Sequence, residues 1–152
     1  ARGRTNTGKE PTRFRVLSVR RIQNRPLFVN YAHRRSQMLA KYADSLQFTD
    51  GNEWLQGADR AVLTDEVLQK VGFGTHLLDR RVNEKFLFHG TDAKSAEVLK
   101  TQGFDNRVAS LIGMFGGGSY FAENSSKSNQ YIPGPEANVP GPFQMLICRV
   151  LL

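Results

Sequence analysis

The chain has 152 residues, 39% of them hydrophobic and 23% charged, which is enough for one soluble globular domain with a core. No apolar run approaches the roughly 20 residues that a membrane helix needs, and the basic, polar N-terminus lacks the apolar stretch of a secretory signal. The single cysteine, Cys148, excludes a disulfide framework within the chain. We therefore expect a cytoplasmic or nuclear protein without a membrane partner.

The net charge of +7 is concentrated at the N-terminus. Residues 1–25 hold eight Lys and Arg side chains and one acid, whereas the other 127 residues hold 13 of each sign and are neutral. A basic arm of this kind either binds nucleic acid or another polyanion through phosphate contacts or serves only as a solubilising tail. Its first part, residues 1–12, is rich in Gly, Thr and Arg and is expected to be disordered.

A strand and a helix are the first elements expected. Arg13–Ile22 alternates partly between apolar and charged side chains, which predicts a strand near a sheet edge. Asn24 is placed to cap a helix that has Pro26 in its first turn and ends at about Tyr42. The inward face of this helix is expected to carry the residues that recur at helical spacing: Leu27, Tyr31, Met38 and Tyr42.

Residues 44–82 carry the weakest structural signals and are interpreted as an insertion. Thr49–Asn52 favours a turn. A second helix is expected to begin at Thr64–Glu66, with acids in its first turn, and to end at Gly72. Its inward residues would be Leu63, Val67, Leu68 and Val71.

The pattern then changes to short apolar runs separated by glycines. Phe86–His89 predicts a buried strand that Gly90 ends. Thr91 or Asp92 is expected to cap a helix over Ala93–Gln102, which Gly103 ends in a left-handed conformation. The residues of this helix expected to face inward are Ala96, Val98 and Leu99.

Glycines also precede the next strand. The cluster Gly113–Gly118 leads into an aromatic strand at Ser119–Ala122, and Ser125 or Ser126 is expected to cap a short polar helix that runs to Tyr131. A loop rich in Pro and Gly follows at Ile132–Pro142. Phe143–Leu152 is apolar and β-branched enough to be a central strand.

The residues between Phe88 and Tyr131 carry the chemistry. Each feature has an ordinary explanation by itself: a histidine in a turn, a flexible glycine loop, or core tyrosines. Together they suit a planar aromatic amide such as nicotinamide, which would stack between the rings of Tyr120 and Tyr131. Because glycine lets a ligand approach the backbone, the N–H and C=O of Gly90 can pair with the carboxamide.

Three further side chains fit the same ligand. The hydroxyl of Ser128 can add a hydrogen bond to the carboxamide. Ala122 keeps the wall of the site small, and His89 can hydrogen-bond a ribose hydroxyl. These residues predict an NAD+-binding site.

Leu87–Thr91, Gly103–Asp105 and Met114–Tyr131 closely resemble the catalytic domain of poly(ADP-ribose) polymerases, and the tankyrase branch is the nearest match. The resemblance extends over roughly Arg13–Tyr42 and Asn83–Leu152. It implies an α+β ADP-ribosyltransferase fold over residues 13–152, with split, mostly antiparallel β-sheets, flanking helices and an NAD+ cleft between the halves.

The resemblance also implies a role for each matching residue. His89 is similar to the first signature residue of the family, which holds ribose hydroxyls, and Tyr120 to the second, one wall of the nicotinamide slot; these two are the expected catalytic residues. Tyr131 looks like the other wall. The remaining expected contacts to NAD+, which is the substrate, are Gly90, Thr91, Asp105, Gly118, Ala122, Lys127 and Ser128.

Two family features are expected to be missing. The third signature residue, usually a glutamate, lies on a strand beyond Leu152, so we expect the chain to lack the C-terminal part of the domain; Glu123 and Glu136 come too early. The tankyrase-type zinc site is also absent, because Ile132–Phe143 contains no Cys or His, and no metal is expected.

Three hypotheses follow. The first is an NAD+-dependent ADP-ribosyltransferase acting on a protein or nucleic-acid acceptor, with mono- or poly-ADP-ribosylation left open. The second is an inactive module that binds NAD+ or ADP-ribose. The third is a polyanion-binding domain that uses residues 1–25.

Overall fold

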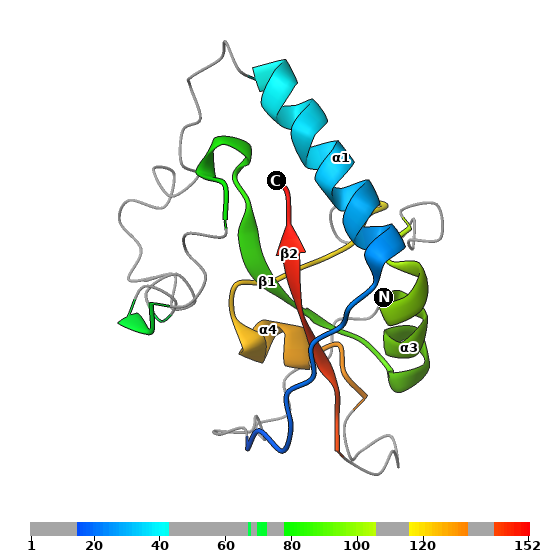
Figure 1. Cartoon of the computed structure of the whole chain (residues 1–152). Helices are drawn as coiled ribbons and strands as arrows, with labels where there is room; N and C mark the ends of the chain where they lie inside the picture. Colours follow the sequence, from blue (N-terminus) through cyan, green and yellow to red (C-terminus); the bar gives the residue numbers. More distant parts are fainter. Residues whose placement is uncertain (1–14, 43–66, 68–69, 73–77, 106–115, 134–141) are drawn as a thin grey trace.

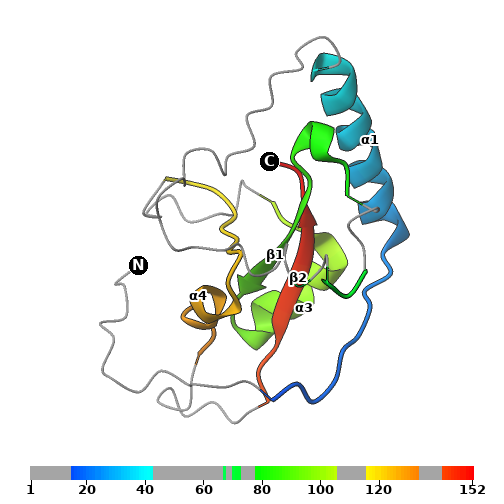
Figure 2. The same ribbon diagram turned by 90° about the vertical axis from the view of Figure 1, so that its left-hand side faces the viewer.

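The computed structural model describes residues 15–42, 67, 70–72, 78–105, 116–133 and 142–152 (Figure 1). Its elements, in chain order, are α1 (Arg25–Tyr42), η3 (Arg80–Val82), β1 (Lys85–Gly90), α3 (Ala93–Gln102), α4 (Ser125–Asn129) and β2 (Met145–Val150). Both views show β1 and β2 side by side, with α1 on one side of them and α4 on the other (Figure 2). Helices with a small antiparallel sheet agree with the α+β class, whereas the split into two sheets stays a prediction.

The sheet that the structure describes has two strands. β1 and β2 are antiparallel, in a register that runs from Lys85 opposite Val150 to Gly90 opposite Met145. On its other edge β1 meets Ala122, which exchanges two backbone hydrogen bonds of 2.7 and 2.9 Å with Phe88. β1 therefore lies between β2 and the Ala122 segment, and β2 is not central among the described residues.

The aromatic strand expected at Ser119–Ala122 is reduced to this single bridge. The backbone bends over residues 116–118 and again over residues 123–124, so that one residue runs alongside β1. A strand requires several consecutive residues paired with a neighbouring strand, and only Ala122 is paired in this segment. The prediction of a strand at Ser119–Ala122 was therefore wrong.

The strand expected at Arg13–Ile22 was also wrong for its described part, residues 15–22. Every side chain in that stretch is exposed, and Val19 is 85% exposed. A strand is stabilised by a neighbouring strand and by burial of one face. Residues 15–22 have neither among the described residues, and so they stay extended without ladder pairing.

Helix α1 forms as expected. The side-chain Oδ1 of Asn24 accepts a hydrogen bond of 3.2 Å from the N–H of Leu27, which satisfies one donor of the first turn. Pro26 lies in that turn, where its missing N–H costs little. The four residues expected on the inward face are each partly buried: Leu27, Tyr31, Met38 and Tyr42.

Helix α3 also has the predicted bounds, with Asp92 as the capping residue. Its carboxylate accepts hydrogen bonds of 3.0 Å from Ser95 N–H and 2.6 Å from Ser95 Oγ, and these bonds hold the pKa of Asp92 below its usual range. Gly103 has a φ of 76°, although its ψ of −169° lies outside the left-handed helical region. Val98 is exposed and not inward, because it lies about 200° around the helix from the buried Ala96.

Two other helix details differ from expectation. α4 is capped by Asn124 and not by a serine, without a side-chain capping bond, and it ends at Asn129. In the middle of the chain Gly72 has the expected positive φ of 63°, but Val67 and Val71 are exposed. The arm at 1–12, the turn at 49–52 and most of the 44–82 insertion lie outside the described residues.

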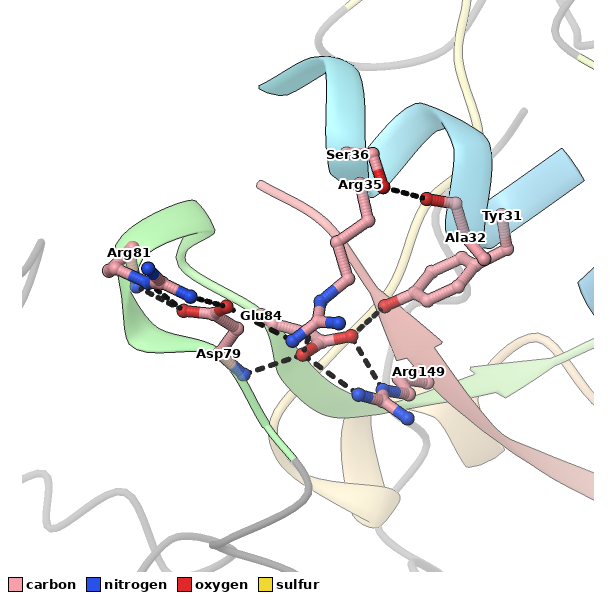
Figure 3. Close-up of polar contacts among 8 residues, drawn as sticks. All are labelled: Tyr31, Ala32, Arg35, Ser36, Asp79, Arg81, Glu84 and Arg149. Atoms are coloured by element: carbon pink, nitrogen blue, oxygen red, sulfur yellow. Dashed lines mark hydrogen bonds and ion pairs between the residues drawn. The ribbon is translucent and has the colours of Figure 1, made fainter. Parts of the chain in front are cut away.

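A buried carboxylate connects these elements (Figure 3). Glu84, just before β1, accepts hydrogen bonds from Arg149 of β2 at 2.5 Å (Nε) and 3.0 Å (Nη2) and from the backbone N–H of Asp79 at 2.6 Å. The hydroxyl of Tyr31 on α1 donates to the same carboxylate. Arg35 Nε, which is buried without a hydrogen bond, lies 3.5 Å from it. One charged group thus holds α1, β1 and β2 together.

A second carboxylate supports the same cluster. Asp79 bonds Arg35 Nη2 at 3.0 Å and Arg81 Nη2 at 2.8 Å, and the hydrogen bonds from Arg81 lower the pKa of Asp79. Burial by itself raises the pKa of Glu84, but its bonds with Arg149, Tyr31 and Asp79 outweigh burial and hold that pKa below 4.5. Burial, followed by the hydrogen bond to Glu84, raises the pKa of Tyr31, so its hydroxyl remains a donor.

We predict that Glu84→Gln lowers the free energy of unfolding by about 3–5 kcal/mol at neutral pH, because it removes the buried charge with which Arg149 and Arg35 both pair. Since the folded pKa of Glu84 is depressed, its contribution is present above 4.5 and disappears as the pH falls through the folded pKa. Urea unfolding measured at several pH values should therefore show the two proteins converging in acid.

The matched control for Glu84→Gln is Glu97→Gln. Glu97 is an exposed carboxylate of α3 that pairs with Lys100 on the surface. Surface ion pairs contribute little, so this variant should unfold like the parent. Equal stability of Glu84→Gln and Glu97→Gln would show that the buried cluster does not hold the fold together.

Candidate functional site

The site predicted from the sequence is built around the end of β1. His89 Nδ1 lies 2.8 Å from the backbone carbonyl oxygen of Tyr120. A carbonyl oxygen only accepts hydrogen bonds, so Nδ1 carries the proton and donates it. In the neutral ring Nε2 is then an acceptor, which suits it to receive a hydrogen bond from a hydroxyl group.

Two phenylalanine rings enclose the imidazole of His89. Phe104, just after α3, meets it edge to face, with ring centroids 4.9 Å apart and planes at 85°. Phe121 meets it at 5.6 Å, and the two phenylalanine rings contact each other at 4.9 Å. Sequence analysis did not predict this cluster. The available signal was the position of Phe104 directly after the glycine that ends α3.

Gly90 turns its backbone polar groups towards the other predicted site residues. In an antiparallel ladder the N–H and C=O groups of residues two apart face the same side. Because Phe88 bonds to Ala122, the N–H and C=O of Gly90 also face away from β2, towards the Tyr120–Ser128 side. This orientation agrees with the predicted use of these groups as ligand contacts.

Packing gives a second reason for glycine at position 90. A Cβ atom there would lie 1.8 Å from the carbonyl oxygen of Ser128 and 3.1 Å from Cγ1 of Ile132. Ser128 is itself buried, and its carbonyl accepts a 3.1 Å hydrogen bond from the N–H of Tyr131. The close approach of α4 to β1 therefore requires that residue 90 has no side chain.

The two predicted tyrosine walls differ in environment. Tyr120 is partly buried, and its hydroxyl donates a 2.6 Å hydrogen bond to the carbonyl of Gly116. Tyr131 is 55% exposed, and the ammonium of Lys127 lies 5.7 Å from the centroid of its ring. Lys127 also donates to Gln130 Oε1 at 3.2 Å. An exposed aromatic ring is available for stacking with a flat ligand.

The structure thus joins most of the predicted site residues in pairs: His89 with Tyr120, Gly90 with Ser128, and Lys127 with Tyr131. Ala122 lies beside Phe88 at the bridge. The other predicted contacts are partly buried, and their roles stay predictions: Thr91, Asp105 and Gly118.

Other reactive groups do not form a second centre in the described ranges. Burial raises the pKa of the Cys148 thiol to about 11, so that the thiol is protonated and a poor nucleophile at neutral pH. Glu123 lies 3.9 Å from the ammonium of Lys85. Across the part of the chain that the structure describes, no three His, Cys, Asp or Glu side chains gather as metal ligands, and no helix is long and apolar enough to cross a membrane.

Comparison with known proteins identifies relatives of the whole chain. The sequence model of one protein family, the poly(ADP-ribose) polymerase catalytic domain, matches residues 2–152 of this chain. A probable poly(ADP-ribose) polymerase of Dictyostelium discoideum is 30% identical over 142 residues, which are 91% of this chain and 32% of that protein. The mouse protein mono-ADP-ribosyltransferase PARP12 is 43% identical over 74 residues, 48% of this chain and 10% of that protein.

A third relative is the human protein mono-ADP-ribosyltransferase PARP14, which is 28% identical over 127 residues, 82% of this chain and 5% of that protein. The chain thus spans at most about a third of the length of these relatives. None of the three is named as a tankyrase, and the nearer likeness to that branch stays a prediction.

We predict that Gly90→Ala destabilises the protein by about 1–3 kcal/mol, because its Cβ atom would overlap the carbonyl of Ser128. Gly118→Ala is the matched control, since a Cβ atom there meets nothing within 4 Å. Thermal unfolding followed by circular dichroism distinguishes the two. A Gly90→Ala protein that melts with the parent would contradict the tight packing of α4 on β1.

Proposed function

Because this chain belongs to the poly(ADP-ribose) polymerase catalytic domain family, we propose that it is an ADP-ribosyltransferase with NAD+ as its substrate. The observation that carries the proposal is the 2.8 Å hydrogen bond between His89 Nδ1 and the Tyr120 carbonyl. It joins the first two residues of the family's signature across 31 positions of sequence and leaves Nε2 as an acceptor for a ribose hydroxyl.

The nicotinamide ring is proposed to stack between Tyr120 and Tyr131. The N–H of Gly90 would donate to the carboxamide oxygen, and the C=O of Gly90 would accept from the carboxamide nitrogen. The orientation of Gly90 away from β2 supports this pairing. Ser128, packed against Gly90, would add its hydroxyl to the same carboxamide.

The remaining contacts would hold the rest of NAD+. Lys127, beside Tyr131, brings a positive charge to the nicotinamide side of the site. Thr91, Asp105 and Gly118 are proposed as the other contacts, with Asp105 on the adenosine side. Ala122 leaves room next to Phe88.

In the proposed reaction the bond between nicotinamide nitrogen and ribose carbon breaks, and its electron pair leaves with nicotinamide. An oxygen of the acceptor, for example a protein carboxylate or hydroxyl, forms a new bond to the same carbon and loses any proton that it carries. The ribose carbon passes through an oxocarbenium-like state. The protein contributes by orienting NAD+ and by stabilising developing charge.

We predict that His89→Ala or Tyr120→Ala lowers transfer from labelled NAD+ by roughly 100-fold or more, because each removes a group that orients the reacting ribose and nicotinamide. Tyr120→Phe keeps the ring and loses only the bond to Gly116, so it should retain most of the activity. Electrophoresis of the labelled product shows in the same assay whether one unit or a polymer is added.

Full transfer by both alanine variants would refute this site. A parent protein that binds NAD+ in calorimetry but transfers nothing would instead be an NAD+- or ADP-ribose-binding module, which is the alternative within the same family.

A second function is favoured by a separate observation. Residues 15–25 contain four arginines and no acid, and all four side chains are exposed: Arg15, Arg20, Arg21 and Arg25. We propose that this stretch, together with the preceding basic residues, contacts the phosphates of nucleic acid.

We predict that Arg21→Gln makes the negative slope of log affinity against log salt shallower by about 0.7 for single-stranded RNA, since one phosphate contact is lost. Lys94→Gln, which removes an exposed cation from α3, is the matched control and should leave the slope unchanged. Fluorescence anisotropy over a salt series measures both. Identical slopes for Arg21→Gln and the parent would exclude the arm from binding.

A further inference from the structure

We propose that Phe104 is a positioning residue for His89, which holds the imidazole in the single orientation that presents Nε2 to NAD+. This inference rests on the proposed function, because it assigns Nε2 a substrate to meet. Nothing in the sequence pattern of the site gave Phe104 a role. Its edge-to-face contact with His89 at 4.9 Å, closer than the tilted contact of Phe121, distinguishes it from the other described phenylalanines.

The imidazole of His89 is held at three places. Its Nδ1–H donates to the Tyr120 carbonyl, Phe104 meets it edge to face at 4.9 Å and 85°, and Phe121 meets it at 5.6 Å and 54°. A half-turn of the ring about its bond to Cβ would put a carbon where Nδ1 now meets the carbonyl. Because a half-turn leaves the ring plane unchanged, the hydrogen bond is what opposes it; the edge-to-face contact with Phe104 keeps the ring in the plane in which Nδ1–H reaches the carbonyl.

The backbone that leads into Phe104 is held where the start of α1 contacts the end of α3. Gly103 turns the chain at the end of α3, and a Cβ atom on it would lie 2.9 Å from Cδ2 of Leu27. Asn24, which caps α1, also donates through Nδ2 to the carbonyls of Lys100 at 3.3 Å and Thr101 at 2.9 Å. The start of α1 thus fixes the end of α3, and Phe104 lies two residues beyond that end.

The position of Phe104 leaves its outer edge partly open. The side chain is 37% exposed although it contacts two rings, so removing it costs little of the core. This makes a folded Phe104→Ala protein the expected outcome. Phe104→Tyr retains the ring that the proposal requires.

The test compares the full chain with Phe104→Ala, Phe104→Leu and Phe104→Tyr, and with Phe28→Ala as the matched control. Phe28 is an exposed phenylalanine on α1 and belongs to no part of the site. Two measurements are made on each protein. Nitrogen-15 NMR of the imidazole, above about pH 8 where histidine is neutral, reports which ring nitrogen of His89 carries the proton. Transfer kinetics with NAD+ report kcat and KM.

The expected result is that the parent, Phe104→Tyr and Phe28→Ala all show one His89 tautomer, protonated on Nδ1. Phe104→Ala and Phe104→Leu should show a mixture of tautomers and a kcat/KM about tenfold lower. Phe104→Leu keeps most of the side-chain volume, so it separates loss of the aromatic contact from loss of packing.

A His89 that keeps its single Nδ1–H tautomer in both Phe104→Ala and Phe104→Leu would overturn the proposal, as would unchanged kcat/KM in a parent that is active. The NMR measurement needs neither NAD+ nor turnover. If the parent transfers nothing, the proposed function fails in the kinetic assay, while the tautomer of His89 still decides whether Phe104 positions the ring.

Discussion

The buried carboxylate of Glu84 determines how the described elements meet. Placing a charge in the interior is expensive, and it persists only where partners replace the water it lost. Here those partners come from separate parts of the chain: Arg149 from β2, Tyr31 and Arg35 from α1, and the backbone of Asp79. A different register of β1 on β2 would move Arg149 away from Glu84 and break the two hydrogen bonds between them. The cluster therefore specifies one arrangement, where apolar contacts alone would accept several.

The same arrangement reaches the predicted site through β1. Glu84 directly precedes the strand, and His89 and Gly90 end it, so the anchor and the site lie at opposite ends of six paired residues. A strand paired on one edge along its length, and bonded at Phe88 on the other, transmits the position of its beginning to its end. α1 is held at two places too, by Tyr31 and Arg35 in its middle at Glu84 and by Asn24 at its start against the end of α3. The site is thus supported from two directions by one helix.

The sequence was sufficient where structure is local and insufficient where it depends on distant partners. The starts of α1 and α3 could be predicted because their caps, Asn24 and Asp92, act within a few positions. The strands expected at 13–22 and 119–122 failed because pairing is decided by another segment. Glu84 is an acid before a predicted strand, and no neighbouring residue in the sequence predicts its pairing with Arg149, 65 positions away. The proposed site residues His89, Gly90, Tyr120 and Ser128 could be named from their residue types and from the family resemblance, and their roles stay predictions. Phe104 and Phe121 were missed because their role consists of a ring contact that only the fold creates.

The hydrogen bond between His89 and Tyr120 has a backbone acceptor, so a change of the Tyr120 side chain does not remove that acceptor. The acceptor is a backbone carbonyl, which every amino acid supplies, so no substitution at position 120 removes it while the backbone keeps its course. The tautomer of His89 therefore depends on the chain path, which supplies the acceptor, and on the neighbouring aromatics, which keep the ring in the plane that reaches this acceptor. Loss of the Tyr120 ring should consequently remove the proposed nicotinamide wall without altering the protonation of His89. Loss of Phe104 should do the reverse. The two halves of the proposed site, one proposed to stack nicotinamide and one proposed to orient the ribose, are therefore physically separable although they share Tyr120.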